Sequence, residues 1–381
     1  MSECGPECAL GEAFGAMAPA PSDRAAAALR RLGRGVNIFW AALPRLTSED
    51  WHGLASRGVG HVRLCASLVD PLIEWSTCPA TTRSLREEEA VAALRRTRAM
   101  AELKAAAHAA RRAGLSAVLN PMHRLHTLQV RADTLRWVWS AMLLEFDEGA
   151  FPSDGLVFEL VNEPGNYHNH TVVGSRWVDM LPDVLELIAR AQPKRVVIVG
   201  AEMGRRTDQP SAAAAGFVRT RADLYSSAVA TAAASSRAID FVNSGPALAM
   251  DAASIADLGK RFALIATFHF YRPRNFTSQG LPDVVHPQPR WKASAADLAD
   301  LATQFDEARR ALGPAIPVYL GEFGVNVDLI PHPEDGVSWL RHVRAICDAR
   351  GFGWAVWTYY LTVKGARISI GPRACTMCRD L

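Results

Sequence analysis

Two glutamates, Glu163 and Glu322, each follow a run of apolar residues and could act together as a catalytic pair. Glu163 comes after the run at 156–162, and Glu322 comes after the run at 316–321. A continuous apolar run is typical of a parallel strand buried on both faces, and α/β proteins carry their chemistry at the C-terminal ends of such strands. Two carboxylates flanking one site are what glycoside hydrolysis requires: one protonates the leaving oxygen, and the other attacks the sugar or activates water. The alternative is that each glutamate is an ordinary loop acid.

The elements that must position this pair can be read from the same alternation of apolar runs and helical stretches. Strands are predicted near 36–40, 61–65, 117–122, 156–162, 196–201, 264–270, 316–321 and 353–358. Helices are predicted near 47–57, 86–113, 131–147, 174–191, 212–236, 295–312 and 335–350. Eight strands that alternate with helices in one uninterrupted array predict an α/β fold, a single-domain (β/α)8 TIM barrel over residues 35–381.

Two segments depart from a minimal barrel. Residues 1–34 precede the first strand and are expected to form a partly ordered N-terminal lead-in. Residues 202–262, between the fifth and sixth strands, are too long for one helix and its loops. An insertion after the C-terminal end of a strand lies on the catalytic face of a barrel, so this enlarged segment is expected to shape the substrate site.

The composition limits the classes of partner. Of the 381 residues, 49% are hydrophobic and 21% are charged, and the formal net charge is only +3. We expect a globular protein with a large core and no nucleic-acid surface, since no dense stripe of lysine and arginine is present. No apolar run approaches the ~20 residues of a membrane span. The N-terminus lacks the basic start and apolar core of a signal peptide, so the sequence leaves the compartment open.

Seven cysteines are present, and four of them lie near the two ends of the chain, Cys4 with Cys8 and Cys375 with Cys378. The ends of a closed barrel come from neighbouring elements, so these four side chains could meet. Three interpretations remain open: free thiols in frayed tails, one or two disulfides, or a structural zinc site with four soft ligands.

The predicted strand ends carry a set of polar and aromatic side chains suited to binding a sugar. They are Trp40, Arg63, His123, Asn162 with Glu163, Glu202, His269 with Tyr271, Glu322, and Trp357. A barrel brings all of these strand ends to one rim, which makes one common site the expectation.

In this register the chain resembles glycoside hydrolase family 5, the cellulase family of the clan A retaining glycosidases. The matching stretches run from Gly35-Val36-Asn37 and Val62-Arg63-Leu64, through Val118 to His123 and Glu159-Leu160-Val161-Asn162-Glu163-Pro164, to Phe268-His269-Phe270-Tyr271, Gly321-Glu322-Phe323-Gly324 and Trp354-Ala355-Val356-Trp357. They span residues 35–358, nearly the whole chain. The tripeptide Asn-Glu-Pro alone is a weak motif. It becomes specific because the other stretches occur in the expected order at the other strand ends.

The resemblance implies that Glu163 is the general acid/base and that Glu322 is the nucleophile. The carboxyl groups of a retaining pair lie ~5–5.5 Å apart, and two acids that close do not both ionise easily. We expect Glu322 to stay ionised because Arg63 and Tyr271 would donate to it. Glu163 is expected to hold its proton until Glu322 is esterified, so that it can act first as acid and then as base.

Arg63 lies within an apolar strand, where an unpaired cation would be very costly, so it must have a carboxylate partner. That partner is either Glu322 or Glu159, and a purely structural Arg63–Glu159 pair is the alternative to a catalytic role. Asn162 is expected to bond the 2-hydroxyl of the reacting sugar, and Trp357 resembles the aromatic platform beneath that sugar.

The remaining candidates have different expected contacts. The two histidines are expected to contact sugar hydroxyls or the carboxylates, the glutamate a hydroxyl, and the two aromatic residues could be sugar platforms at neighbouring subsites. His123 and His269 are predicted supporting residues, and the weaker candidates are Trp40, Glu202 and Tyr359. Core packing explains Trp40 and Tyr359 equally well. This chemistry needs no cofactor and no catalytic metal.

The sequence therefore predicts a retaining glycoside hydrolase acting on β-linked glycans, specifically an endo-β-1,4-glucanase. A β-mannanase or another β-glycanase or β-glycosidase of the same family is the alternative within the enzyme class. The alternative from another class is a non-catalytic carbohydrate-binding protein on a hydrolase scaffold. The expected partner is a polysaccharide or oligosaccharide, the expected assembly is a monomer, and the resemblance implies a secreted or periplasmic protein.

Overall fold

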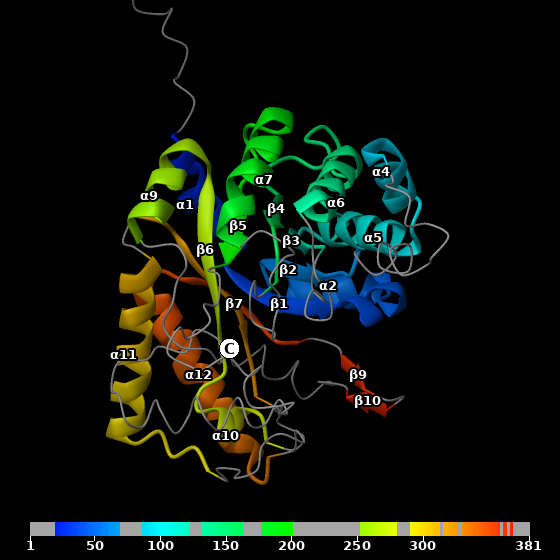
Figure 1. Ribbon diagram of the computed structural model, residues 1–381. Coiled ribbons are helices and arrows are strands. Elements are labelled where there is room, and N and C mark those ends of the chain that lie inside the picture. Colours follow the sequence, from blue (N-terminus) through cyan, green and yellow to red (C-terminus); the bar gives the residue numbers. More distant parts are fainter. Residues whose placement is uncertain are drawn as a thin grey trace, which may run out of the picture.

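The structure, a computed structural model, describes residues 20–68, 86–121, 132–162, 177–200, 252–279, 290–312, 315–325, 330–358, 361–363 and 366–368. Eight parallel strands form a closed barrel in which each strand pairs with the next along the chain, and β8 closes onto β1 (Figure 1). The strands are β1 (Arg34–Phe39), β2 (His61–Cys65), β3 (Ser116–Asn120), β4 (Leu156–Glu159), β5 (Val197–Gly200), β6 (Leu264–Phe270), β7 (Val318–Phe323) and β8 (Gly353–Val356). The predicted barrel is confirmed, with every strand close to its expected position.

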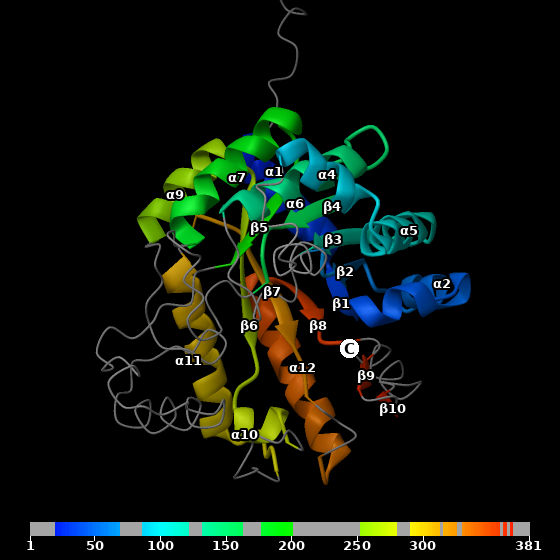
Figure 2. The ribbon, with the colours of Figure 1, turned by 45° about the vertical axis from the view of Figure 1, so that its right-hand side comes forward.

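Helices follow the strands and surround the barrel (Figure 2). They are α1 (Pro21–Leu32), α2 (Ser48–Ser56), α4 (Glu87–Arg95), α5 (Arg98–Arg112), α6 (Ala132–Glu145), α7 (Trp177–Ala191), α9 (Ala252–Arg261), α10 (Arg274–Thr277), α11 (Ala295–Leu312) and α12 (Pro333–Arg350). A 3-10 helix, η2 (Trp40–Arg45), follows β1, and a short antiparallel pair, β9 (Leu361–Val363) with β10 (Ala366–Ile368), follows β8. Within the described part of the chain, no helix is long and apolar enough to cross a membrane.

The prediction of a single helix over 86–113 is wrong in one respect, because the segment forms two helices, α4 and α5. The break falls at Thr97, whose hydroxyl accepts a hydrogen bond from the Met100 amide at 3.2 Å and donates to the Leu94 carbonyl at 2.7 Å. A threonine in this arrangement is a helix N-cap, which competes with helix continuation.

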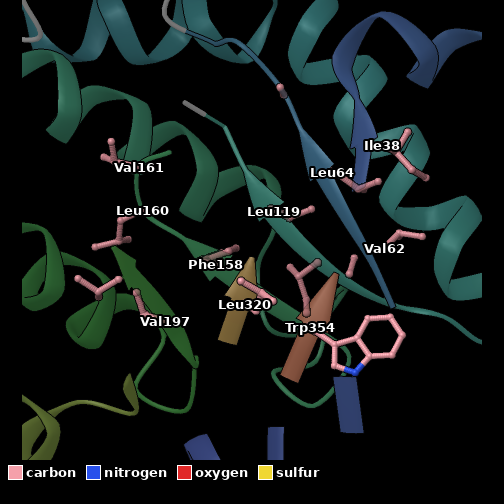
Figure 3. Close-up of a cluster of buried hydrophobic side chains, with 14 of the residues drawn as sticks. Ile38, Val62, Leu64, Leu119, Phe158, Leu160, Val161, Val197, Leu320 and Trp354 are labelled. Carbon is pink, nitrogen blue, oxygen red and sulfur yellow. The ribbon is translucent and has the colours of Figure 1, made fainter. Parts of the chain in front are cut away.

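One face of each strand packs against the surrounding helices. Because side chains alternate along a strand, residues two apart share a face, and the outward set of the barrel is apolar throughout. Figure 3 shows part of this layer, with labelled side chains from adjacent strands such as Leu64, Leu119 and Phe158. All three are fully buried, which explains why the strands read as continuous apolar runs.

The inward face of the barrel changes character along its length. Near the N-terminal ends of the strands it is apolar, with Val157, Ile265 and Tyr319 packed against the buried face of α1. Helix α1 lies at the opposite end of the barrel from α10 in both views (Figures 1 and 2). The segment expected to be a partly ordered lead-in therefore contains a helix that covers the bottom of the barrel.

A buried histidine ties α1 to the strands at this end. The Nδ1 atom of His61 lies 2.8 Å from the Leu32 carbonyl, at the end of α1, and its Nε2 atom lies 2.8 Å from the Tyr319 hydroxyl. A carbonyl can only accept, so Nδ1 carries the proton and Nε2 accepts from Tyr319. Burial lowers the pKa of His61 from its ordinary value to about 4, so the ring is neutral at neutral pH.

Candidate active site

Toward the C-terminal ends of the strands, the inward face becomes polar and centres on Arg63 of β2. Its side chain is fully buried, and its guanidinium has five N–H donors. Five hydrogen bonds to oxygen atoms are formed, with acceptors supplied by four residues from β1, β4 and β7 and the segment directly after β4. These acceptor residues are Asn37, Glu159, Asn162 and Glu322.

Glu159 takes one edge of the guanidinium in a two-point contact. The Nε atom of Arg63 lies 2.5 Å from Oε2 of Glu159, and Nη2 lies 2.8 Å from Oε1. Both side chains are completely buried, so neither charge has access to water. Burial alone would lower the pKa of Arg63, but the carboxylates of Glu159 and Glu322 raise it well above its ordinary value, so the arginine is permanently charged.

Glu322 occupies the other side of the same cation. Its Oε1 atom accepts from Nη1 of Arg63 at 2.8 Å, and its Oε2 atom accepts from the Tyr271 hydroxyl at 2.8 Å. The Nδ1 atom of His269 lies 3.5 Å from the same Oε2. Only 5% of Glu322 is exposed, so an ionised carboxylate here depends on these donors rather than on water.

A bulge in β7 turns Glu322 into the barrel. The pairing between β6 and β7 shifts so that Phe268 lies opposite Leu320 while His269 lies opposite Glu322, which leaves Gly321 as an extra residue. Leu320 and Phe323 both pack outward, three positions apart instead of two. Gly321 has no space for a side chain, because an added Cβ would lie 2.8 Å from Oγ1 of Thr267 and 3.0 Å from Nε2 of His269. Bulges of this kind re-aim side chains next to active sites.

Two asparagines also accept hydrogen bonds from the arginine, and these bonds fix the orientation of each side-chain amide. Oδ1 of Asn37 lies 2.7 Å from Nη1 of Arg63, and Oδ1 of Asn162 lies 2.8 Å from Nη2. Because a guanidinium can only donate, each of these contacts must use the amide oxygen. The Nδ2 group of Asn37 then donates to the Gly321 carbonyl at 2.9 Å, which links β1 to the bulge that carries Glu322.

Cys65 completes the surroundings of the arginine. Nη1 of Arg63 lies 3.3 Å from its sulfur atom, and the thiol is fully buried. Burial raises the pKa of Cys65 well above its ordinary value, although Arg63 acts in the opposite direction, so the thiol adds no charge to the cluster.

The segment that carries Tyr271 is held by two further side chains. Oγ1 of Thr277 in α10 donates to the Tyr271 carbonyl at 2.6 Å, and Nε1 of Trp339 in α12 donates to the Arg272 carbonyl at 2.9 Å. Both Thr277 and Trp339 are buried. The tyrosine that contacts Glu322 is therefore supported by side chains of α10, at the C-terminal end of β6, and of α12.

Aromatic residues lie at the ends of β8 and β1. Trp357 is half-buried, and its ring packs edge-on against Phe39 at a centroid distance of 5.8 Å. Trp40 contacts the same phenylalanine at 5.4 Å. The Trp357–Thr358 peptide is cis, and the Thr358 hydroxyl donates to the Asn37 carbonyl at 2.8 Å.

The sequence prediction can be compared with these positions residue by residue. Arg63, Asn162, His269, Tyr271 and Glu322 come together in one cluster, with Trp357 and Trp40 at the neighbouring strand ends. Glu163, His123, Glu202 and Tyr359 lie outside the described residues, as do Cys4, Cys8, Cys375, Cys378 and most of the 202–262 segment. Glu163 directly follows Asn162 in the chain. The described residues contain no group of three or more His, Cys, Asp or Glu side chains placed to hold a metal ion.

Sequence reasoning placed none of Asn37, Cys65 and Phe39 in the site, and it treated Glu159 only as an alternative partner of Arg63. Cys65 was expected to be a small buried core residue, and it is fully buried. A signal for three of these four residues was present. Asn37, Cys65 and Glu159 interrupt otherwise apolar strands with a polar group or a thiol. Because side chains alternate along a strand, each of them lies on the inward face of the barrel, as Arg63 does. Phe39 carries no such signal, because an aromatic residue at the end of a strand is ordinary.

Comparisons with known proteins agree with this geometry. The model of the family described as Cellulase (glycosyl hydrolase family 5) matches residues 32–361. No curated protein sequence is significantly similar to the chain.

Solved structures of similar fold include one described as an endoglucanase, with a TM-score of 0.59, 20% identity, and coverage of 93% of this chain and 99% of that chain. Thermotoga maritima Cel5A in complex with cellobiose gives a TM-score of 0.59 at 19% identity, covering 94% of this chain and 99% of that chain. The same Thermotoga maritima protein with mannotriose gives 0.57 at 20% identity, covering 93% and 96%.

The family match identifies the protein as a glycoside hydrolase, an enzyme that acts on carbohydrate, and its (β/α)8 barrel, with a carboxylate held by arginine and tyrosine inside the C-terminal ends of the strands, fits that class. The chain belongs to glycosyl hydrolase family 5, the cellulase family.

Proposed function

We propose that the protein is a retaining β-glycanase that uses Glu322 as nucleophile and Glu163 as general acid/base, and that it is an endo-β-1,4-glucanase. The observation that carries the proposal is the environment of Glu322. Its two oxygens accept from Arg63 and Tyr271, which orients the carboxylate while it is shielded from water. An ionised, fixed carboxylate is what attack on an anomeric carbon requires.

Asn162 supports the same assignment. Its Oδ1 atom is occupied by Arg63, so its Nδ2 group is the part left to donate to a ligand. An amide donor beside the nucleophile suits the 2-hydroxyl oxygen of the reacting sugar, a contact that strengthens in the transition state. Glu163, the next residue in the chain, would protonate the leaving oxygen and later deprotonate the attacking water. Trp357, with its half-buried ring, would lie beneath the sugar.

The preference for β-1,4-glucan draws on endoglucanases of the same fold, and one specific observation favours a second candidate. The Thermotoga maritima Cel5A structures include complexes with cellobiose and with mannotriose. Glucose and mannose differ only in the configuration at the carbon that carries the 2-hydroxyl. A β-mannanase is therefore the alternative, with the same catalytic pair.

The test is hydrolysis of soluble β-glucan, mannan and xylan by the wild type, with Glu322→Gln and Glu163→Gln beside it. We expect release of reducing ends from β-1,4-glucan by the wild type, and losses of several orders of magnitude in both variants, with circular dichroism spectra unchanged. NMR of the first product should show the β-anomer, as double displacement requires. Near wild-type rates in either variant would contradict the role of that glutamate, and an initial α-anomer would contradict retention.

A further inference from the structure

Arg63 lies between two carboxylates, although one would balance its charge. Glu159 makes two hydrogen bonds to the guanidinium, whereas Glu322 makes one. Glu322 is accounted for by the proposed chemistry. Glu159 is completely buried, and placing a second buried carboxylate beside the first is electrostatically costly, so its presence calls for a physical reason.

The charges around this cluster can be counted element by element. Arg63 supplies one positive charge from β2, and Glu159 and Glu322 supply one negative charge each from β4 and β7. The other described groups that face them are neutral amides, a neutral thiol, a phenol and an imidazole: Asn37, Asn162, Cys65, Tyr271 and His269. With His269 neutral and both carboxylates ionised, the cluster carries a net charge of −1.

The proposed reaction removes one of these negative charges. In the first step an oxygen of Glu322 forms a bond to the anomeric carbon, the glycosidic C–O bond breaks, and the leaving oxygen takes the proton of Glu163. The ester of Glu322 is neutral, so it no longer balances Arg63. With Glu159 in place, Arg63 keeps a two-point ionic partner in the intermediate. With a neutral residue at this position, the intermediate would contain a buried cation without a counter-ion, which is strongly unfavourable.

The same carboxylate also affects the attacking group. Without Glu159, the whole charge of Arg63 would act on Glu322 and stabilise it in the resting state. An interaction that is stronger in the resting state than in the transition state slows the chemical step. A net negative cluster, in contrast, favours the positive charge that develops on the sugar.

We propose that Glu159 is a positioning residue that balances the charge of Arg63 throughout the reaction cycle, so that Glu322 stays nucleophilic and can be esterified. This inference rests on the proposed function for the identity of Glu322 as nucleophile. It assigns Glu159 no contact with the substrate.

The test is Glu159→Gln, with Glu159→Asp as the variant that keeps the charge. A dinitrophenyl β-cellobioside is the appropriate substrate, since its leaving group needs no general acid. The value of kcat/KM then reports attack by Glu322, whereas kcat also includes hydrolysis of the ester. We expect kcat/KM of Glu159→Gln to fall by about 100-fold and the acidic limb of its pH profile to move to lower pH, because a negative neighbour has been removed. Glu159→Asp should show smaller changes in the same direction.

Glu145→Gln is the matched control. The Glu145 carboxylate is also held by two cations, Arg95 at 2.6 Å and Lys104 at 2.7 Å, but it lies on α6 outside the barrel. Its substitution should leave kcat/KM and the pH profile of the folded enzyme unchanged. A loss of activity in Glu159→Gln without movement of the acidic limb would indicate a merely structural role and would overturn the proposal, as would a wild-type kcat/KM.

A second readout needs no substrate. NMR of isotope-labelled carboxyl carbons follows the titration of Glu322 directly, with the resonance assigned by Glu322→Gln. Glu322 should titrate at a lower pH in Glu159→Gln than in the wild type, with Glu159→Asp closer to the wild type. An unchanged titration in Glu159→Gln would refute the charge-balancing role. If this shift is found while the wild type hydrolyses none of the glycans, the proposed function fails and the electrostatic role of Glu159 stands.

Discussion

Replacement of Arg63 by lysine tests whether the fork geometry of the guanidinium organises the site. Arg63 makes five hydrogen bonds to oxygen, whereas an ammonium has three donors on one atom, so at least two acceptors lose their partner. Hydrogen bonds to charged groups contribute ~1.5–3 kcal/mol each, so two lost bonds cost about 3–6 kcal/mol in total. The positive charge itself is retained, which separates geometry from charge.

The cost should be divided between stability and catalysis. A lysine that stays with Glu159 gives up the contact to Glu322, and the loss of ~1.5–3 kcal/mol there corresponds to a decrease in kcat of about 10- to 150-fold. The remainder should lower the free energy of unfolding. Hydrolysis of an aryl β-cellobioside gives the first quantity, and urea unfolding followed by tryptophan fluorescence gives the second.

Arg195→Lys is the control for this experiment. Arg195 is also buried and donates to Gln192 at 2.8 Å and to the Leu156 and Phe151 carbonyls at 2.8 Å each, so the same substitution breaks a comparable network away from Glu322. We expect Arg195→Lys to lower stability and to leave kcat of the folded enzyme unchanged. If Arg63→Lys kept kcat within twofold of the wild type, the argument that the guanidinium fork orients Glu322 would be refuted.

Three further predictions follow from the same contacts. Tyr271→Phe removes the hydroxyl that lies 2.8 Å from Glu322, so kcat should fall by about 10- to 150-fold with little change in urea midpoint, and an unchanged kcat would contradict the contact. Gly321→Ala places a Cβ 3.0 Å from Nε2 of His269, so urea unfolding should show a loss of about 1–3 kcal/mol together with reduced kcat, and wild-type values would argue against the bulge. His61 has a pKa of about 4 when folded and ~6.5 when unfolded, so the unfolded state binds more protons between these values and stability falls as pH falls through this window. Urea unfolding across it should show a loss of about 3 kcal/mol in the wild type that is absent in His61→Gln, and equal losses would contradict the buried neutral ring.

The barrel could be predicted from sequence because the residues on the outward face of its strands are consistently hydrophobic. Leu64, Leu119 and Phe158 are apolar because helices cover them, and most inward residues at the bottom are apolar because α1 covers them, with His61 as an exception. Both faces of each strand are then hydrophobic, and the runs stand out. The position of helix α1 was harder to predict from sequence, since it depends on which residues at the bottom of the barrel the helix packs against.

The candidate site was predictable only in part, for a physical reason. Arg63 stands out as a cation inside an apolar strand and had to have a carboxylate partner, and Glu322 and Tyr271 stand at the ends of their strands. Sequence alone posed Glu159 and Glu322 as alternatives for Arg63, whereas the structure pairs the arginine with both. A guanidinium with two usable edges can serve two acids, and which edges meet which strands depends on register and on the bulge at Gly321, neither of which local sequence encodes.

His61 and Arg63 lie on the same strand, but the contacts of His61 concern stability and those of Arg63 also concern the proposed chemistry. They are two residues apart on the inward face of β2, and both are completely buried. His61 faces α1 and Tyr319, where a neutral ring needs only one donor and one acceptor. Arg63 faces Glu159 and Glu322, where a permanent charge is useful because, in the proposed mechanism, the charge of Glu322 changes during the reaction. Substitutions at the first position should therefore change unfolding, while those at the second should change unfolding and catalysis together, although the two Cα atoms are separated by only ~7 Å of strand.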